Sequence, residues 1–233
     1  MATGNASPVN RLLDALPTRD RRRMFAQLDS VELPMADVLY NLGERLDRVY
    51  FPLNCFISLI MPIDDTSLEV GLIGSEGMFG IPLALGVDMS PVRAVVQGAG
   101  SALCMSAASF RRELARNRPL QREIGRYAFV RASQLAQMAG CTRFHVIEAR
   151  LARWLLMTQD RAHANSFHIT QELLAAMLGV RRVGVTKAAS SLQKRNLIRY
   201  NRGRMTVLDR RGLEAASCGC YDEDCRSYER ILG

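Results

Sequence analysis

The chain has 233 residues, of which 48% are hydrophobic and 23% are charged, and its formal net charge is +8. This composition is ordinary for a globular protein with room for two modest domains. There is no run of about 18 apolar residues, and the polar start lacks the basic end and apolar core of a signal peptide, so we expect a cytoplasmic protein without a membrane span. Six cysteines in a chain of this length do not indicate a disulfide scaffold.

The N-terminal half predicts a short helical segment followed by a β-roll. Residues 11–28 carry leucines, Met24 and Phe25 among arginines, which indicates an amphipathic helix or a pair broken at Pro17. Between residues 31 and 105, short apolar runs alternate with turn residues, a pattern typical of a β-roll or small barrel. The runs are residues 38–40, 49–51, 56–61, 68–73, 94–97 and 102–105.

Two glycine-rich passages interrupt these predicted strands. Glycine recurs at every third residue from Gly71 to Gly80, and a further pair stands at Gly98 and Gly100. The backbone N–H groups of such segments can hold a phosphate, and the same glycines can simply form tight turns. The local pattern favours turns, and the phosphate-binding alternative stays open.

Three helices are predicted after the β-roll. The first covers about residues 106–115, and a much longer one begins at residue 119 or 120. Apolar side chains recur along this long helix at a spacing of about 3.5 residues, which suits a seam between two parallel copies of the helix. Arg131 interrupts this apolar pattern. The seam residues are Ile124, Ala128, Leu135 and Met138. The alternative is a helix packed only on the β-roll. The third helix, about residues 147–161, is apolar enough to be core.

Residues 170–208 have the pattern of a winged helix-turn-helix. Thr170 can cap a first helix, and Gly179 suits the left-handed turn that follows it. The second helix, about residues 181–194, has a predicted inner face of Val185, Ala188, Ala189 and Leu192, and a polar face of Arg182, Thr186, Ser190 and Lys194. Residues 196–200 and 205–208 alternate as two strands around a turn, which predicts the wing.

Positive charge is concentrated in this segment. Between Thr170 and Arg211 there are ten basic residues and two acidic ones, so the segment carries a net charge of +8, equal to that of the whole chain. Such a concentration on one module indicates attraction to phosphate groups of a nucleic acid. The alternative is a solvated basic face on a winged helix that contacts protein.

The C-terminal residues 218–233 contain three cysteines, Cys218, Cys220 and Cys225. Their spacing matches no common zinc motif closely, so a soft-metal site or a redox pair is the alternative to an untethered, reduced tail. The histidines are scattered and are interpreted as surface or capping residues: His145, His163 and His168. No catalytic triad, Walker loop or carboxylate pair is present, so the sequence does not predict an enzyme.

The order of a β-roll, a long helix and a winged helix-turn-helix resembles the Crp/Fnr family of bacterial transcription regulators, over about residues 12–208. The resemblance implies an α+β fold with a cyclic nucleotide-binding-like double-stranded β-helix at residues 11–117. A dimerisation helix and hinge at 118–145 and a DNA-binding domain at 146–217 would follow. It also implies a homodimer on an inverted repeat of double-stranded DNA, with RNA polymerase as an expected partner.

The resemblance also implies which residues contact DNA. An Arg-Glu-x-x-x-Arg pattern reads base edges in the family, and Arg182, Val183 and Lys187 occupy those places here. Arg182 can bind guanine with two hydrogen bonds, whereas Val183 cannot accept one from cytosine, so the operator should differ from that of the cyclic-AMP receptor. Phosphate contacts and positioning are expected at Thr170, Gly179, Arg181, Thr186, Ser190, Arg202 and Arg204.

The effector pocket implied by the family departs from the family pattern. Its residues here are Gly80, Ile81, Arg93, Ala94, Leu135 and Ala136. Ile81 replaces a glutamate that holds the ribose hydroxyl, and losing that hydrogen bond would cost about 1–3 kcal/mol. We therefore expect a ligand other than cyclic AMP, or none; the cofactor is unknown. Arg93 either binds another anion or pairs with an acid such as Asp88. No cysteine precedes Cys55, which argues against the family's N-terminal iron–sulfur cluster.

A rival interpretation from another class is a ligand-binding signalling module whose winged helix contacts protein. DNA binding that depends steeply on salt concentration would separate the two.

Overall fold

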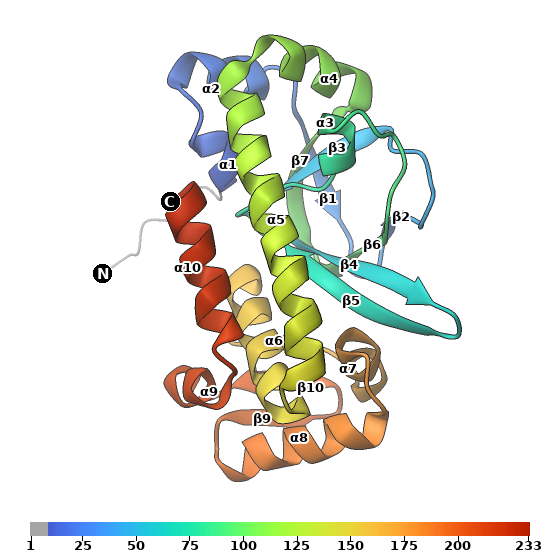
Figure 1. Cartoon of the computed structure of the whole chain (residues 1–233), viewed down its shortest axis with the longest axis vertical. Coiled ribbons are helices and arrows are strands. Elements are labelled where there is room, and N and C mark those ends of the chain that lie inside the picture. The colour runs from blue at the N-terminus through green and yellow to red at the C-terminus, as the bar shows by residue number, and fades with distance from the viewer. Residues whose placement is uncertain (1–8) are drawn as a thin grey trace.

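Two short helices open the structure, a computed structural model that describes residues 9–233 (Figure 1). They are α1 (Arg11–Asp14) and α2 (Thr18–Phe25), so the prediction of a pair broken at Pro17 is confirmed. The buried Asn10 side chain caps α1 and donates hydrogen bonds to the carbonyl oxygens of Pro52 and Gly77, at 3.0 and 2.8 Å. These bonds fasten the first helix to the β-roll.

The β-roll consists of two antiparallel sheets. One has the order β1-β7-β3, with β1 (Asp29–Leu33), β7 (Gly100–Ser106) and β3 (Arg48–Pro52). The other has the order β2-β6-β4-β5, with β2 (Val38–Tyr40), β6 (Arg93–Gly98), β4 (Phe56–Ile63) and β5 (Thr66–Ile73). Fully buried side chains such as Phe51 and Ile57 form the core between them. Strand β1 was not predicted from the sequence, because most of its side chains are exposed and its apolar pattern is weak.

Two helices connect the β-roll to the C-terminal part, whereas the short α3 (Ile81–Ala84) lies within the roll, between β5 and β6. Helix α4 (Ala107–Arg116) leads into α5 (Arg118–Phe144), which runs along most of the length of the molecule in Figure 1. A side chain at Gly77 would overlap the ring of Tyr127 on α5, and one at Gly71 would overlap the guanidinium of Arg131. These two glycines therefore let the long helix pack closely on the β-roll, and side chains of α5 fill the space beside them.

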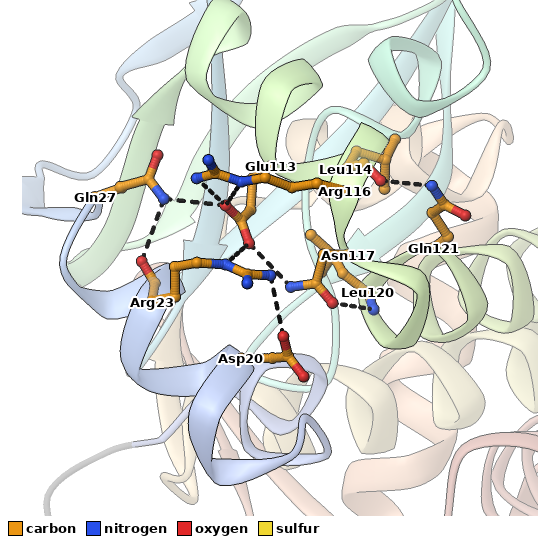
Figure 2. Close-up of polar contacts among 9 residues, drawn as sticks. All are labelled: Asp20, Arg23, Gln27, Glu113, Leu114, Arg116, Asn117, Leu120 and Gln121. Carbon is orange, nitrogen blue, oxygen red and sulfur yellow. Dashed lines mark hydrogen bonds and ion pairs between the residues drawn. The ribbon is translucent and has the colours of Figure 1, made fainter.

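Glu113 joins α2 to the junction of α4 and α5 (Figure 2). Its carboxylate is fully buried and accepts hydrogen bonds from Arg23 at 2.6 Å, Arg116 at 2.7 Å, and the side-chain amides of Asn117 and Gln27 at 3.1 Å. Burial opposes the charge, but the hydrogen bonds outweigh it and lower the pKa of Glu113 to about 2. Asn117 also caps α5 by accepting from the Leu120 N–H.

We expect Glu113→Gln to lower the free energy of unfolding at pH 7 by about 2 kcal/mol, after allowance for solvent screening of the half-exposed arginines. Because the folded-state pKa is depressed, this stabilisation is present above about pH 4.5 and is lost as the pH falls towards 2. Urea unfolding at pH 7 and pH 3 measures it. Glu32→Gln, on the exposed side of β1, is the control. Equal losses for the two variants at pH 7 would contradict this account of the network.

The C-terminal half forms a winged helix-turn-helix. Helix α6 (Ile147–Ala162) precedes α7 (Gln171–Leu178) and α8 (Arg182–Lys194), and α9 (Arg210–Ala216) follows. A small sheet of order β8-β10-β9 completes it, with β8 (Ser166–His168), β10 (Arg204–Val207) and β9 (Ile198–Asn201). Trp154, Leu155 and Leu192 lie in its core. The predicted α+β order of β-roll, long helix and winged domain is confirmed.

The expectation of an untethered tail is wrong, because most of residues 218–233 form α10 (Cys220–Leu232). This helix lies alongside α5 in Figure 1. Asp224 forms an ion pair with the buried Arg153 of α6, and Tyr228 and Leu232 pack against the core of the β-roll. The tail thus contacts both halves of the molecule. Within residues 9–233, each helix is either too short or too polar to cross a bilayer.

Candidate nucleic-acid interface

The turn between α7 and α8 has the geometry that its residues predict. The Thr170 hydroxyl caps α7 by accepting from the Leu173 N–H at 3.1 Å. Gly179 ends the helix at φ +59°, in the left-handed region that favours glycine. A side chain here would also come within 2.9 Å of Leu68 on β5. The turn therefore favours glycine for its backbone, whereas the contact would require only a small shift of the flexible Leu68 side chain.

The inner face of α8 is confirmed. Val185, Ala188, Ala189 and Leu192 are all buried, two of them completely. Because these four side chains occupy one side of the helix, the remaining side faces solvent. Figure 1 shows α8 at the end of the molecule opposite α2 and α4, next to the wing.

The solvent-facing side of α8 carries the residues expected to read bases. Arg182, Val183 and Lys187 are exposed, and Val183 retains 67% of its accessible surface although it is apolar. The positions expected to contact phosphate are exposed as well: Arg181, Thr186 and Ser190. An exposed valine flanked by cations on a helix of this kind is available for contact with a base edge, such as a thymine methyl group.

Arg182 is held in place by α7. Its guanidinium forms an ion pair with Glu172 at 2.6 Å, and its Nε donates to the Gln171 side-chain oxygen at 3.4 Å. The Thr186 hydroxyl donates to the same oxygen at 2.9 Å. Since Arg182 and Glu172 are both largely exposed, exchanging this pair for a base or phosphate costs at most about 1 kcal/mol. The sequence did not predict that Gln171 positions both side chains, because a glutamine beside a helix cap carries no distinctive pattern.

The wing is confirmed as a tight hairpin. Arg202 and Gly203 form its turn at φ +48° and +78°, as expected for a two-residue turn whose central residues are both left-handed. Arg202 and Arg204 are exposed, and the Arg204 Nε donates to the Ser166 hydroxyl at 3.0 Å. Arg199, on the outer face of β9, is also exposed. The wing thus adds cations beside those of α8.

The predicted dimer seam needs a correction. Ile124 is 3% exposed and belongs to the core of the β-roll, so it cannot lie in a seam with another helix. Ala128 and Met138 are partly buried, and Leu135 is exposed. A different face of α5 is exposed to solvent, and Phe129 on that face is 59% exposed. Periodicity alone did not distinguish the two apolar faces of this helix.

The residues of the implied effector pocket occupy the β-roll and α5. Gly80 has φ +116° and precedes α3, Ile81 packs against the core, and Ala94 is completely buried. Leu135 and Ala136 are exposed on α5. Arg93 is exposed, and among residues 9–233 no ion pair joins it to a carboxylate.

The expected alternative pairing of Arg93 with Asp88 is therefore wrong. Asp88 forms its ion pair with Arg45, at 3.3 Å.

A buried acid links the β-roll to the winged domain. The carboxyl group of Glu69 on β5 is bonded to the Ser58 hydroxyl at 2.6 Å and to the indole N–H of Trp154 on α6 at 2.7 Å. Burial raises the pKa of Glu69 to about 7, although both hydrogen bonds oppose the shift. Nearby, α7 packs against β5, and the Ser58 hydroxyl also contacts the sulfur of Met177. The β-roll and the winged domain are therefore in direct contact at this junction.

The structure separates the three tail cysteines. Cys218 and Cys220 lie beside Cys141 and His145 at the end of α5, whereas Cys225 is exposed on α10. Grouping Cys225 with the other two was therefore wrong. His145 is exposed and caps the C-terminal end of α5, as expected of a surface or capping residue, but it is not isolated.

The comparisons with known proteins agree with this architecture. A family model described as the Crp-like helix-turn-helix domain matches residues 149–216. No curated protein is significantly similar to the chain in sequence.

Similar solved structures include FixK2 from Bradyrhizobium japonicum, at 13% identity and a TM-score of 0.69, covering 82% of this chain and 98% of that one. The c-di-GMP-responsive global regulator CLP from Xanthomonas campestris has 18% identity and a TM-score of 0.67, with coverages of 82% and 99%. A Crp/Fnr-family transcriptional regulator, TTHA1359 from Thermus thermophilus, has 20% identity and a TM-score of 0.62, with coverages of 81% and 98%. Residues 149–216 thus form a Crp-like helix-turn-helix domain, and the chain as a whole has the fold of the Crp/Fnr transcription regulators.

Proposed function

We propose that this protein is a sequence-specific DNA-binding transcription regulator that acts as a homodimer. The observation that supports this most is the solvent-facing side of α8, where Arg182, Val183 and Lys187 are exposed while the opposite side is buried. The net charge of +8 on residues 170–211 gives this surface the sign that DNA phosphates attract. Arg182 and Lys187 would contact base edges, and Arg181, Arg202 and Arg204 would contact phosphates.

The dimer would form along the solvent-exposed face of α5 that carries Phe129. Phe129, Ala132 and Ala136 are exposed at helical spacing, and burying them against a second copy would remove apolar surface from water. Two parallel copies of α5 would carry two winged domains related by a two-fold axis. Their recognition helices would then enter successive major grooves about 34 Å apart on an inverted repeat.

Regulation would act through the junction of Glu69, Trp154 and α7. An effector that binds one arrangement of the two halves better than another shifts the population towards it. The apolar Ile81 and Ala94 still argue against cyclic AMP as that effector, and Arg93, which is exposed, suits an anion of another kind. Activation would require a contact with RNA polymerase, and repression would require only that the bound dimer blocks it.

A mobility-shift titration on genomic fragments tests the proposal. If Arg181, Arg202 and Arg204 of each protomer contact phosphates, the logarithm of the affinity should fall with the logarithm of salt concentration with a slope of about −5. We also expect one subset of fragments to bind at least 10³-fold more tightly than bulk DNA. Absence of binding at low salt would favour the signalling module that contacts protein. A steep slope without selectivity would mean that the recognition helix does not read bases.

A further inference from the structure

Four side chains that could hold a metal ion converge where α5 ends and α10 begins. Cys141 and His145 lie one turn apart at the C-terminal end of α5, and Cys218 and Cys220 flank Gly219 just before and at the start of α10. The three sulfurs and a ring nitrogen of His145 all lie within 4.8 Å of one another. Two pairs that are more than 70 residues apart in the chain therefore meet at one point.

Two of the six separations among these ligand atoms are close to the edges of a tetrahedron around one zinc ion. With bonds of about 2.3 Å to sulfur and about 2.0 Å to nitrogen, tetrahedral angles place two sulfurs about 3.8 Å apart and a sulfur and a nitrogen about 3.5 Å apart. The sulfurs of Cys141 and Cys218 are 3.6 Å apart, and the Cys220 sulfur is 3.5 Å from the His145 Nδ1. A multi-iron cluster would hold its cysteine sulfurs much further apart, so the spacing suits a single ion.

The surroundings also fit a metal centre better than simple packing. Cys141, Cys218 and Cys220 are at most 9% exposed and form a small cluster of their own, apart from the two large cores. Three clustered thiols bury little apolar surface, so the hydrophobic effect alone gives them little reason to converge. His145 is exposed and leaves a route by which an ion can enter.

Two arginines and one amide hydrogen bond surround the four side chains. Three thiolates and Zn²⁺ would carry a net charge of −1, and Arg150 and Arg153 line the same small cavity as Cys141. The Gln137 amide donates to the Cys220 carbonyl at 3.1 Å and holds the start of α10 against α5. Such outer contacts orient metal ligands.

We propose that Cys141, His145, Cys218 and Cys220 form a tetrahedral Zn²⁺ site that fastens α10 to the end of α5. With all four positions filled by protein ligands, its role is structural, because no coordination position remains for water or substrate. The site lies at the hinge that leads from the long helix into the winged domain. Arg150, beside Cys141, donates to the carbonyl of Leu178, directly before the turn into α8. The metal would therefore stabilise the hinge from which the DNA-binding half is positioned.

The test measures zinc in the full-length protein purified under reducing conditions without added chelator. Elemental analysis should give about one zinc per chain. Cys141→Ser and Cys218→Ser should each reduce the bound zinc at least tenfold after dialysis. Cys225→Ser is the matched control, since this cysteine is exposed on the same helix and outside the cluster, and it should retain the metal. Zinc retained at full occupancy in Cys141→Ser and Cys218→Ser would overturn the proposal.

A second measurement holds even if the serine variants fail to fold. Co²⁺ exchanged into the wild-type protein should give the intense visible bands of tetrahedral coordination and the near-ultraviolet charge-transfer band of thiolate ligands. Wild-type protein with neither bound zinc nor this spectrum would refute the site. Mass spectrometry of the unreduced protein that shows a Cys141–Cys218 disulfide and no metal would likewise refute it, and would assign the cluster to redox chemistry instead.

Discussion

Replacing Arg182 by alanine should lower the affinity for the preferred DNA site by about 30- to 2 × 10⁴-fold. A bidentate contact between arginine and guanine contributes about 1–3 kcal/mol of discrimination, and a homodimer makes the contact in both half-sites, so the loss is about 2–6 kcal/mol. The ion pair of Arg182 with Glu172 is exposed and offsets little of this. Fluorescence anisotropy at fixed salt, on a site selected with the wild-type protein, measures the change.

Two variants make this experiment specific. Arg111→Ala removes the same charge from an exposed position on α4, remote from the winged domain, and should leave DNA affinity unchanged. Val183→Glu adds a hydrogen-bond acceptor beside Arg182 and should shift the selected base towards cytosine at one position of each half-site. If Arg182→Ala keeps both the affinity and the selectivity of the wild type, α8 does not dock in the groove as proposed.

The protein should lose stability as the pH rises from about 4.5 to above 7, by about 3 kcal/mol from Glu69 alone. Burial raises the folded-state pKa of Glu69 to about 7, while in the unfolded chain it returns to its ordinary value. The folded state therefore binds more protons than the unfolded state in this window, and the slope of stability against pH is negative. The contribution is fully present below pH 4.5 and is lost as the pH rises through 7.

Glu69→Gln is the matched variant, because the amide keeps the shape of the side chain and can bond to Ser58 and Trp154 without titrating. Its stability should lack this pH-dependent component, and above pH 7 it should exceed that of the wild type. Trp154 is the single tryptophan of the chain, so its fluorescence during unfolding reports on the junction itself. Parallel stability profiles for the two proteins between pH 5 and 8 would show that Glu69 titrates normally and that the junction is open to water.

The elements with a strong local signal were predictable from sequence. The inner face of α8 could be identified residue by residue, since Val185, Ala188, Ala189 and Leu192 repeat at the spacing that places them on one side of a helix. The Thr170 cap, the Gly179 turn and the Arg202-Gly203 hairpin were equally readable, because each depends on the conformational preferences of a few consecutive residues. The attraction to DNA phosphates could also be predicted from sequence, because the net charge of residues 170–211 follows from counting their basic and acidic side chains.

Tertiary structure decided where segments distant in sequence meet. The sequence shows that α5 has apolar residues, but only packing shows that Ile124 faces the β-roll while Phe129 faces solvent. The sequence shows Cys218 and Cys220 in the C-terminal segment, but it does not show that they meet Cys141 and His145, which are more than 70 residues away at the end of another helix. Nothing in the local sequence distinguishes Glu69, and its burial and its hydrogen bond with Trp154 arise only because β5 packs against α6. Local patterns fix the faces of each element, whereas burial, pKa and ligand geometry depend on which faces pack together, and that is settled only when the whole chain folds.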